Sequence, residues 1–313
     1  LEAFGSGLLG VLELQADPPL FVSVVVGARV VATQRVEPGT REVTFVVDLD
    51  ALLEQWANVT MRVVAEDTGE PLSGDMRVDS NTMFPVRDGH WSAPLLPGKH
   101  TLLFWALGYA RVPHEVTLEP GQELDLGEQR IPRELTIDGR LVDADGQPVL
   151  GRLDVGRREA SGRLRFEDDW MYETDEGGVF RIHGLVPGRY VLRTLGDDQV
   201  RSPARDEPPT EWVTGNVEVS TLGGSVTGLE LRCVRAGILV LKGAATLPAE
   251  SRCKMLDARG DLLRHSAFYP GFVPRFALPP GPCTFVLCDG EWNELERREL
   301  AIGAGVNELD LTR

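Results

Sequence analysis

Three segments of this 313-residue chain repeat one pattern: an aromatic or apolar residue, a short spacer, Pro-Gly, and then an alternating apolar strand. The pairs are Pro97-Gly98, Pro187-Gly188 and Pro280-Gly281. Proline presets φ at the first corner of a turn and glycine accepts a positive φ at the second, so each pair is predicted to join two strands tightly. Repetition of this kind indicates an array of small modules.

The strands around the second pair alternate as half-buried strands do. The apolar positions on one face are Phe180, Ile182, Tyr190 and Leu192, and the polar positions opposite are Arg181, His183, Arg189 and Arg193. Upstream, residues 62–74 and 139–151 share a strand, an acidic turn with Gly69 or Gly146, and a following proline. This arrangement predicts a hairpin in each segment.

The motifs Gly139-Arg-Leu-Val-Asp-Ala-Asp-Gly-Gln-Pro148, 174–180 and 184–190 together resemble the carboxypeptidase regulatory-like domain. The resemblance implies a seven-stranded, transthyretin-like sandwich in the same broad group as Cna-B and starch-binding-like folds. Such domains are spacers, adhesive modules or accessory domains of enzymes. The predicted fold class is therefore all-β, a tandem array of small antiparallel β-sandwich modules.

Four modules are predicted. Residues 58–134 and 135–235 carry the resemblance, the latter with a long insertion, while 236–313 is a divergent sandwich that contains most of the cysteines. Residues 1–57 are expected to form a partial N-terminal β module with strands at 20–26 and 42–47. Helical spacing over 48–56 predicts a short helical turn at its end.

The net charge of -16 argues against nucleic-acid binding, because the phosphate backbone would be repelled. No run of 18 apolar residues occurs, so no membrane span is predicted. The chain begins at Leu1 rather than methionine, which is consistent with removal of a signal peptide or anchor, or with a fragment. We expect an extracellular or cell-surface bacterial protein.

No familiar catalytic arrangement is found in the sequence. The five histidines form no HxH or HExxH pair, and Gly-x-Ser-x-Gly, Walker and dinucleotide motifs are missing. We predict no enzyme activity and no cofactor, apart from one candidate site for a calcium ion. Asp143 and Asp145 resemble the opening of a calcium loop, although Asp-Gly is also a common hairpin turn.

Two covalent links are conceivable from the sequence. Cys253 and Cys283 are expected on core faces of different strands and could form a disulfide; buried free thiols are the alternative, for Cys233 and Cys288 as well. Related Cna-B modules can carry an isopeptide crosslink, for which Lys242 and Asn307 are the candidates, with Glu250 or Glu291 as the acid. Coincidence is the alternative there, since the chain has three lysines.

Aromatic residues suggest a carbohydrate surface. Trp105, on a strand that is apolar on both faces, and Trp170 and Tyr172 in the insertion are candidates for stacking on sugars. Packing between modules explains the same residues.

The predicted function is a non-enzymatic, exported or cell-surface scaffold or interaction protein whose partners are other proteins or copies of itself. The alternatives are a carbohydrate-binding accessory module that takes glycans, or the non-catalytic part of a larger enzyme.

Overall fold

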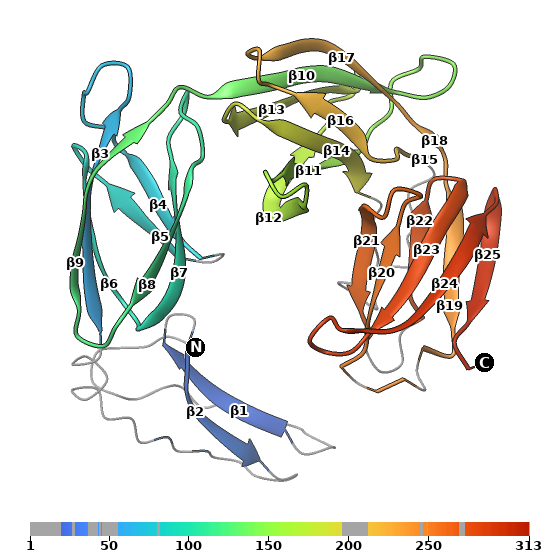
Figure 1. The fold of residues 1–313 in the computed structure, drawn as a ribbon, viewed down its shortest axis with the longest axis horizontal. Coiled ribbons are helices and arrows are strands. Elements are labelled where there is room, and N and C mark those ends of the chain that lie inside the picture. Colours follow the sequence, from blue (N-terminus) through green and yellow to red (C-terminus); the bar gives the residue numbers. More distant parts are fainter. Residues whose placement is uncertain are drawn as a thin grey trace. The chain divides into compact units, whose positions relative to one another are not determined.

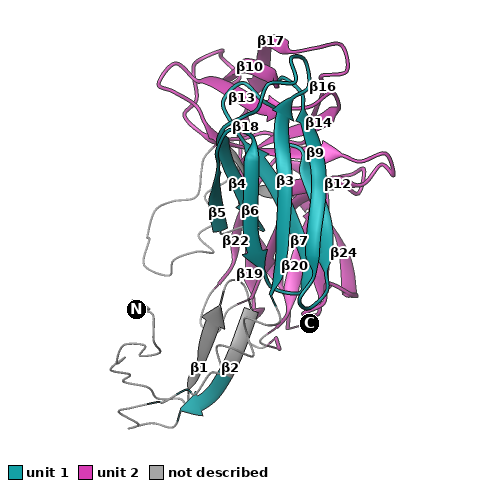
Figure 2. Cartoon of the chain, turned by 90° about the vertical axis from the view of Figure 1, so that its left-hand side faces the viewer, with its two compact units in different colours: residues 1–133 teal, residues 134–313 magenta. Residues whose placement is uncertain are grey.

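The computed structural model describes residues 20–26, 29–36, 43, 45, 56–79, 82–195, 212–244, 247–248, 250–268 and 273–312. The chain divides into two compact units, Leu1–Arg133 and Glu134–Arg313 (Figure 2). Across these described ranges the regular structure consists of strands, and no α-helix occurs. The all-β prediction is confirmed, while the four-module division stays a prediction.

The first unit begins with an antiparallel hairpin, β1 (Leu20–Val26) and β2 (Arg29–Val36). The strand predicted at 20–26 is thus present. The strand predicted at 42–47 and the helical turn predicted at 48–56 lie almost entirely outside the described residues.

The rest of the first unit is a sandwich of two sheets, ordered β6-β3-β9 and β5-β4-β7-β8 (Figure 1). Its strands are β3 (Ala57–Ala65), β4 (Gly74–Val78), β5 (Thr82–Val86), β6 (His90–Leu95), β7 (Gly98–Trp105), β8 (Pro113–Leu118) and β9 (Glu123–Ile131).

The second unit contains two further sandwiches. The second sandwich pairs sheet β13-β10-β17 with β12-β11-β14-β16. Its strands are β10 (Leu135–Val142), β11 (Arg152–Arg158), β12 (Leu164–Glu173), β13 (Val179–Leu185), β14 (Arg189–Leu195), β16 (Val217–Ser220) and β17 (Val226–Arg232). A short ladder of β15 (Trp212–Val213) and β18 (Val234–Arg235) lies beside it.

The third sandwich repeats this order with β22-β19-β25 and β21-β20-β23-β24. Its strands are β19 (Gly237–Lys242), β20 (Arg252–Leu256), β21 (Leu262–Ala267), β22 (Arg275–Leu278), β23 (Gly281–Cys288), β24 (Glu294–Ile302) and β25 (Gly305–Asp310). Although its sequence motif is the weakest of the three, its strand order is the same.

Each sandwich encloses its own apolar core, formed by the alternating positions of facing strands. The predicted face of the second sandwich is confirmed: its four apolar residues are at most 1% exposed. Burial of one such side chain contributes about 1.5–3 kcal/mol. These cores therefore stabilise the individual sandwiches.

The Pro-Gly corners join successive strands closely, as predicted. They join two strands, but those strands do not pair: β6 and β7 lie in different sheets, as do β13 and β14, and β22 and β23. Gly98 (133°) and Gly281 (132°) have the positive φ angle expected of glycine, whereas Gly188 does not. The motif therefore carries the chain from one sheet of a sandwich to the other.

The hairpins predicted downstream of β3 and β10 are present as single bridges, Val64 to Pro71 and Val142 to Pro148.

One pair of strands in each sandwich departs from the antiparallel expectation. The first and last strands run parallel, β3 with β9, β10 with β17 and β19 with β25. Parallel pairing is available because the intervening strands form a long crossover connection.

Four connections use one five-residue turn that begins with aspartate, at Asp143, Asp175, Asp257 and Asp289. In each, the aspartate N–H donates to the carbonyl four residues on, and its Oδ1 accepts N–H groups two and four residues on at 2.8–3.0 Å. The fourth residue has a positive φ, 67–81°. We call this the Asp turn.

Candidate functional site: a buried arginine interface between two sandwiches

The most buried charged pair among the described residues lies where the second sandwich meets the third. Asp154 on β11 is directly opposite Arg193 on β14 in the sheet register. Strand alternation places Arg193 away from its own core, as predicted, yet its side chain is only 3% exposed and that of Asp154 9%. Contacts of Arg193 with β21 of the third sandwich and with Phe166 of its own sandwich contribute to this burial.

Arg193 bonds to both sandwiches. Its Nε and Nη2 donate to Asp154 Oδ2 at 2.9 and 2.6 Å. Its Nη1 donates to the main-chain oxygens of Leu262 (2.6 Å) and Leu263 (2.5 Å), both on β21 of the third sandwich. The guanidinium carbon lies 3.6 Å from the centroid of the Phe166 ring. A planar guanidinium suits this arrangement, because its donors diverge in one plane and its face stacks on an aromatic ring.

A reciprocal contact runs the other way. Arg264, 3% exposed on β21, donates from Nη2 to the main-chain oxygen of Thr194 on β14 at 2.6 Å. Thr194 and Thr214 exchange two hydrogen bonds, each from a main-chain N–H to the other hydroxyl, at 2.9 and 2.8 Å. Each sandwich therefore places an arginine on main-chain carbonyls of its neighbour.

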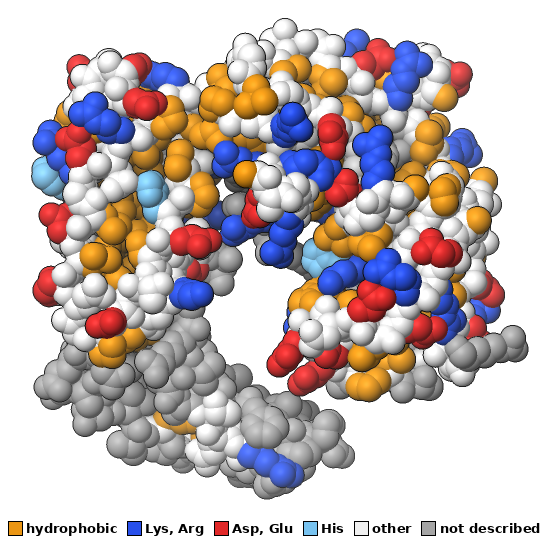
Figure 3. Space-filling view, viewed as in Figure 1, with side chains coloured by type: hydrophobic (Ala, Val, Ile, Leu, Met, Phe, Trp, Pro, Cys, Tyr) orange, Lys and Arg blue, Asp and Glu red, His pale blue; other side chains and the backbone are white. Residues whose placement is uncertain are grey.

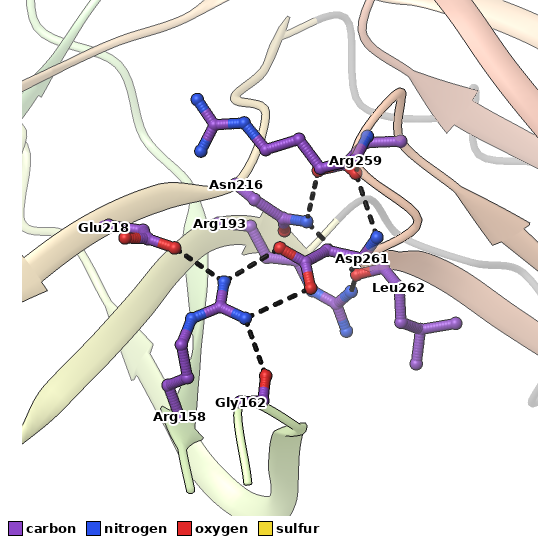
Figure 4. Close-up of polar contacts among 9 residues, drawn as sticks. Arg158, Gly162, Arg193, Asn216, Glu218, Arg259, Asp261 and Leu262 are labelled. Atoms are coloured by element: carbon purple, nitrogen blue, oxygen red, sulfur yellow. Dashed lines mark hydrogen bonds and ion pairs between the residues drawn. The ribbon is translucent and has the colours of Figure 1, made fainter. Parts of the chain in front are cut away.

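A second set of contacts between the two sandwiches lies beside Arg193 (Figure 4). Arg158 Nη2 donates to Asp261 Oδ2 at 2.8 Å and to Glu218 Oε1 at 2.6 Å, and Nη1 donates to Gly162 O at 2.9 Å. The hydrogen bond with Asp261, opposed by partial burial and aided by Glu218, raises the pKa of Arg158. Asn216 Nδ2 donates to Asp257 Oδ2 at 3.0 Å. The Asp turn at Asp257 thus presents two carboxylates to the second sandwich.

We use the name arginine interface for the residues that make these contacts: Asp154, Arg158, Arg193, Thr194, Asn216, Glu218, Asp257, Asp261, Leu262, Leu263 and Arg264. The link between its two sandwiches is short, since β17 ends at Arg232 and β19 begins at Gly237. Sequence reasoning missed the interface. The available signal was weak: Asp154 interrupts the apolar pair Leu153 and Val155, but nothing in the sequence tells which strand lies opposite it.

The calcium candidates lie in an Asp turn. Asp143 Oδ1 accepts the N–H groups of Asp145 (2.9 Å) and Gln147 (2.8 Å). The carboxylate is therefore used to shape the turn. Within the described ranges, no group of three or more His, Cys, Asp or Glu side chains is placed to hold a metal ion. Calcium at this turn stays a prediction.

The stacking candidates belong to different units and differ in exposure. Trp105, in the first unit, is 46% exposed, with the guanidinium of Arg111 5.1 Å from its ring centroid. Tyr172, in the second unit, packs against the core, and its hydroxyl donates to His183 O at 2.8 Å. The side chain of Trp170 lies outside what the structure describes. Trp105 alone of the three presents an exposed ring among described side chains.

The disulfide prediction for Cys253 and Cys283 is not supported. Cys253 lies opposite Leu287, four residues from Cys283 along β23. Four strand residues span about 13 Å, whereas bridged cysteines have Cα atoms within about 7 Å. All four cysteines are buried free thiols.

Lys242 and Asn307 are not brought together either. Lys242 lies opposite Asp310, three residues beyond Asn307. Its Nζ donates to Glu308 Oε2 at 2.6 Å, while Asn307 Nδ2 donates to the carbonyls of Gly303 and Gly305 at 3.0 Å. An odd offset puts the two side chains on opposite faces of the sheet.

The first sandwich carries an open hollow of about 620 Å³, lined in part by Arg62, His90 and Glu128. It follows a bulge at which β9 has one residue more than β3, with Gly127 at a φ of 66°. Bulges bend a strand locally, which accounts for the hollow.

No model of a known protein family matches the sequence, and no curated protein matches it. Among solved structures, the chain is similar to the Bacillus anthracis TIE protein, at 15% identity and a TM-score of 0.24, over 82% of this chain and 51% of that one. It is also similar to the shaft pilin SpaA of Lactobacillus rhamnosus GG, at 12% identity and a TM-score of 0.28, over 58% of this chain and 98% of that one. A streptococcal ancillary pilin is similar at 11% identity and a TM-score of 0.25, over 82% of this chain and 99% of that one. This chain therefore spans about half of the TIE protein chain. TM-scores this low carry no inference about function.

In the described part of the chain, no helix is long and apolar enough to cross a membrane.

Proposed function

We propose that this chain is a non-catalytic structural segment of an exported or cell-surface protein, in which the second and third sandwiches form one rigid pair. The observation that carries the proposal is the bonding of Arg193, which joins Asp154 of its own sandwich to two main-chain carbonyls of the next. The further proposal that the modules are carboxypeptidase regulatory-like domains is supported by the sequence motifs alone.

Rigidity follows from the kind of contact. Most interfaces between domains of one chain resemble transient contacts and permit relative motion. Opening this interface would break the hydrogen bonds from Arg193 to Leu262 and Leu263. A buried arginine that is left without a partner costs several kcal/mol. The short link between β17 and β19 limits motion further.

The state of the cysteines is compatible with an oxidising location. Burial, with a smaller contribution from Asp143, raises the pKa of Cys233 to about 12. Burial, with Glu299, raises the pKa of Cys283 to about 11. Since the thiolate is the reactive form, these thiols resist disulfide exchange at neutral pH.

Distance measurement between two spin labels tests the rigid pair. Val179 and Val306, 44% and 69% exposed, are replaced by cysteine in the full chain and labelled, while the buried native thiols remain unlabelled. We expect a narrow distance distribution that broadens in Arg193→Met. A broad distribution in the parent chain would contradict the proposal. Labelling of intact source cells with an antibody to the chain tests the surface location.

A carbohydrate-binding accessory role is the second candidate, because Trp105 is exposed beside Leu103 on the outer face of β7. Exposed indole rings stack on sugars. Quenching of tryptophan fluorescence by neutral oligosaccharides that is lost in Trp105→Ala would support it.

A further inference from the structure

Trp292 occupies a backbone position that other copies of its turn give to glycine. In the Asp turns the fourth residue is Gly146 (φ 77°), Gly178 (71°), Gly260 (81°) and, in the copy that begins at Asp289, Trp292 (67°). A bulky residue at positive φ is a strained outlier. Strain of this kind persists where the surroundings hold it in place, and it concentrates at sites of function.

The surroundings of the indole are cationic. Arg252 Cζ lies 4.8 Å and Lys254 Nζ 5.1 Å from its ring centroid, and the His265 ring meets it edge to face at 5.5 Å. Arg252 and Lys254 are two residues apart on β20, so they share one face of the sheet. Attraction of both cations to the indole holds together two like charges that would otherwise repel. We call these four residues the indole cluster.

The two cations of the cluster form no ion pair among the described residues, although carboxylates lie nearby: Asn293 and, more weakly, Arg252 lower the pKa of Asp289, and Arg297 and, more weakly, Lys254 lower the pKa of Glu294. Among the described residues, neither Arg252 nor Lys254 has a carboxylate within ion-pair distance, and Lys254 donates only a long bond of 3.4 Å to Trp292 O. Arg297, on the same sheet, is paired with Glu294 at 2.7 Å. In a chain of net charge -16, two adjacent unpaired cations are a local exception. Figure 3 shows basic side chains beside a histidine on the third sandwich.

The position of the cluster restricts what it can bind. His265 lies on the edge strand β21, whereas Arg252, Lys254 and Trp292 lie on β20 and on the turn after β23, the two central strands of sheet β21-β20-β23-β24. Their main-chain groups are used by neighbouring strands, so a peptide cannot add as a further strand. Val286 and Cys288 beneath are 3% and 0% exposed, so this face is closed rather than grooved. A ligand must be recognised by side chains alone.

We propose that the indole cluster binds the carboxylate groups of an acidic polysaccharide. Carboxylates accept from Arg252 and Lys254 as charge-assisted hydrogen bonds. The apolar face of the sugar ring packs against the indole. This site is separate from the arginine interface, whose hairpin lies at the other end of β20, and the proposal does not depend on the rigid pair.

Calorimetric titration of the full chain at low salt tests the proposal with polygalacturonate, neutral dextran and polyglutamate as probes. We expect polygalacturonate to bind, with an affinity that falls as salt is raised, and dextran not to bind. Arg252→Gln and Lys254→Gln should each weaken binding about tenfold, as expected for loss of one charge-assisted bond. Lys99→Gln, the same change at an exposed lysine of the first sandwich, should leave the affinity unchanged.

Trp292→Gly supplies a variant whose backbone suits the turn. It should keep the native circular dichroism spectrum and still lose about tenfold in affinity for polygalacturonate. Equal binding by Lys254→Gln and the parent chain would overturn the proposal, as would equal binding of dextran. Tighter binding of polyglutamate than of polygalacturonate would assign the cluster to an acidic protein partner and overturn the polysaccharide.

Discussion

Gly260 and Trp292 occupy the same position in two copies of one turn, and both have a left-handed backbone, with φ angles of 81° and 67°. Each donates its N–H to the aspartate carbonyl three residues earlier, at 2.9 and 3.1 Å. For glycine this conformation is unstrained, whereas for tryptophan it costs about 1–3 kcal/mol.

Replacement of Trp292 by glycine is therefore expected to leave the free energy of unfolding within about 1 kcal/mol of the parent value. The relief of about 1–3 kcal/mol of strain offsets the loss of two exposed cation–π contacts, worth about 0.5–1 kcal/mol each. Urea denaturation measures the difference. Gly260→Ala, which adds a Cβ into open space, is the matched control and should cost about 1–2 kcal/mol. A loss above about 2 kcal/mol in Trp292→Gly would show that the indole is kept for packing.

Arg193→Met should destabilise the second unit by about 3–5 kcal/mol, because Asp154 is left buried without its partner. Addition of Asp154→Leu should recover much of that loss, since an apolar pair of similar volume tolerates burial. Chemical denaturation followed by far-ultraviolet circular dichroism reports both values. Arg152→Met is the control: its ion pair with Glu173 has side chains 54% and 70% exposed, and its removal should change little. Similar losses from Arg152→Met and Arg193→Met would contradict the assigned role of Arg193.

Stability is expected to fall as the pH is lowered below about 6.5, in part because of His114. Burial lowers the pKa of His114, and its Nε2 has no hydrogen-bond partner among the described residues. Below the ordinary pKa of 6.5 the unfolded chain takes up a proton that the folded chain does not, so the folded state loses stability until its own pKa is reached. Denaturation of parent and His114→Gln between pH 7.5 and 5 tests this. An equal pH dependence in both would exclude His114 as a source.

All four cysteines should react with an alkylating reagent only after unfolding. Burial raises the pKa of Cys233, Cys283 and Cys288, so little thiolate forms at neutral pH. Intact mass after alkylation in denaturant without reductant should show four adducts. Two adducts would mean that a disulfide forms after all, and rapid labelling of native protein would mean that a buried thiol is accessible.

The strands and their buried faces were predictable because each core is built from alternating residues close together in sequence, as at Phe180 and Ile182. Strand pairing was not, because the Pro-Gly motif indicates that two strands are joined closely but does not indicate that they lie in different sheets. The arginine interface was harder still to predict from the sequence. The alternation of its strand predicts that Arg193 faces outward, and its burial by β21 of the third sandwich and by Phe166 depends on contacts that the sequence does not reveal. Trp292 becomes visible in the sequence once the Asp turns are aligned, which requires knowing that Asp289 begins one.

The parallel pairing of first and last strands gives each sandwich a mechanical character. The chain reaches β3 at one end of the first sandwich and leaves β9 at the other, and β10 with β17 and β19 with β25 repeat this arrangement. Tension on the chain would draw the two strands past each other along their length. Their cross-strand hydrogen bonds would then be sheared together, whereas a terminal antiparallel pair pulled from one end would open one bond at a time. We expect pulling of single molecules to show high, separate rupture forces for the three sandwiches, and uniformly low forces would refute that expectation. A chain built this way resists stretching with the same strands that close its cores.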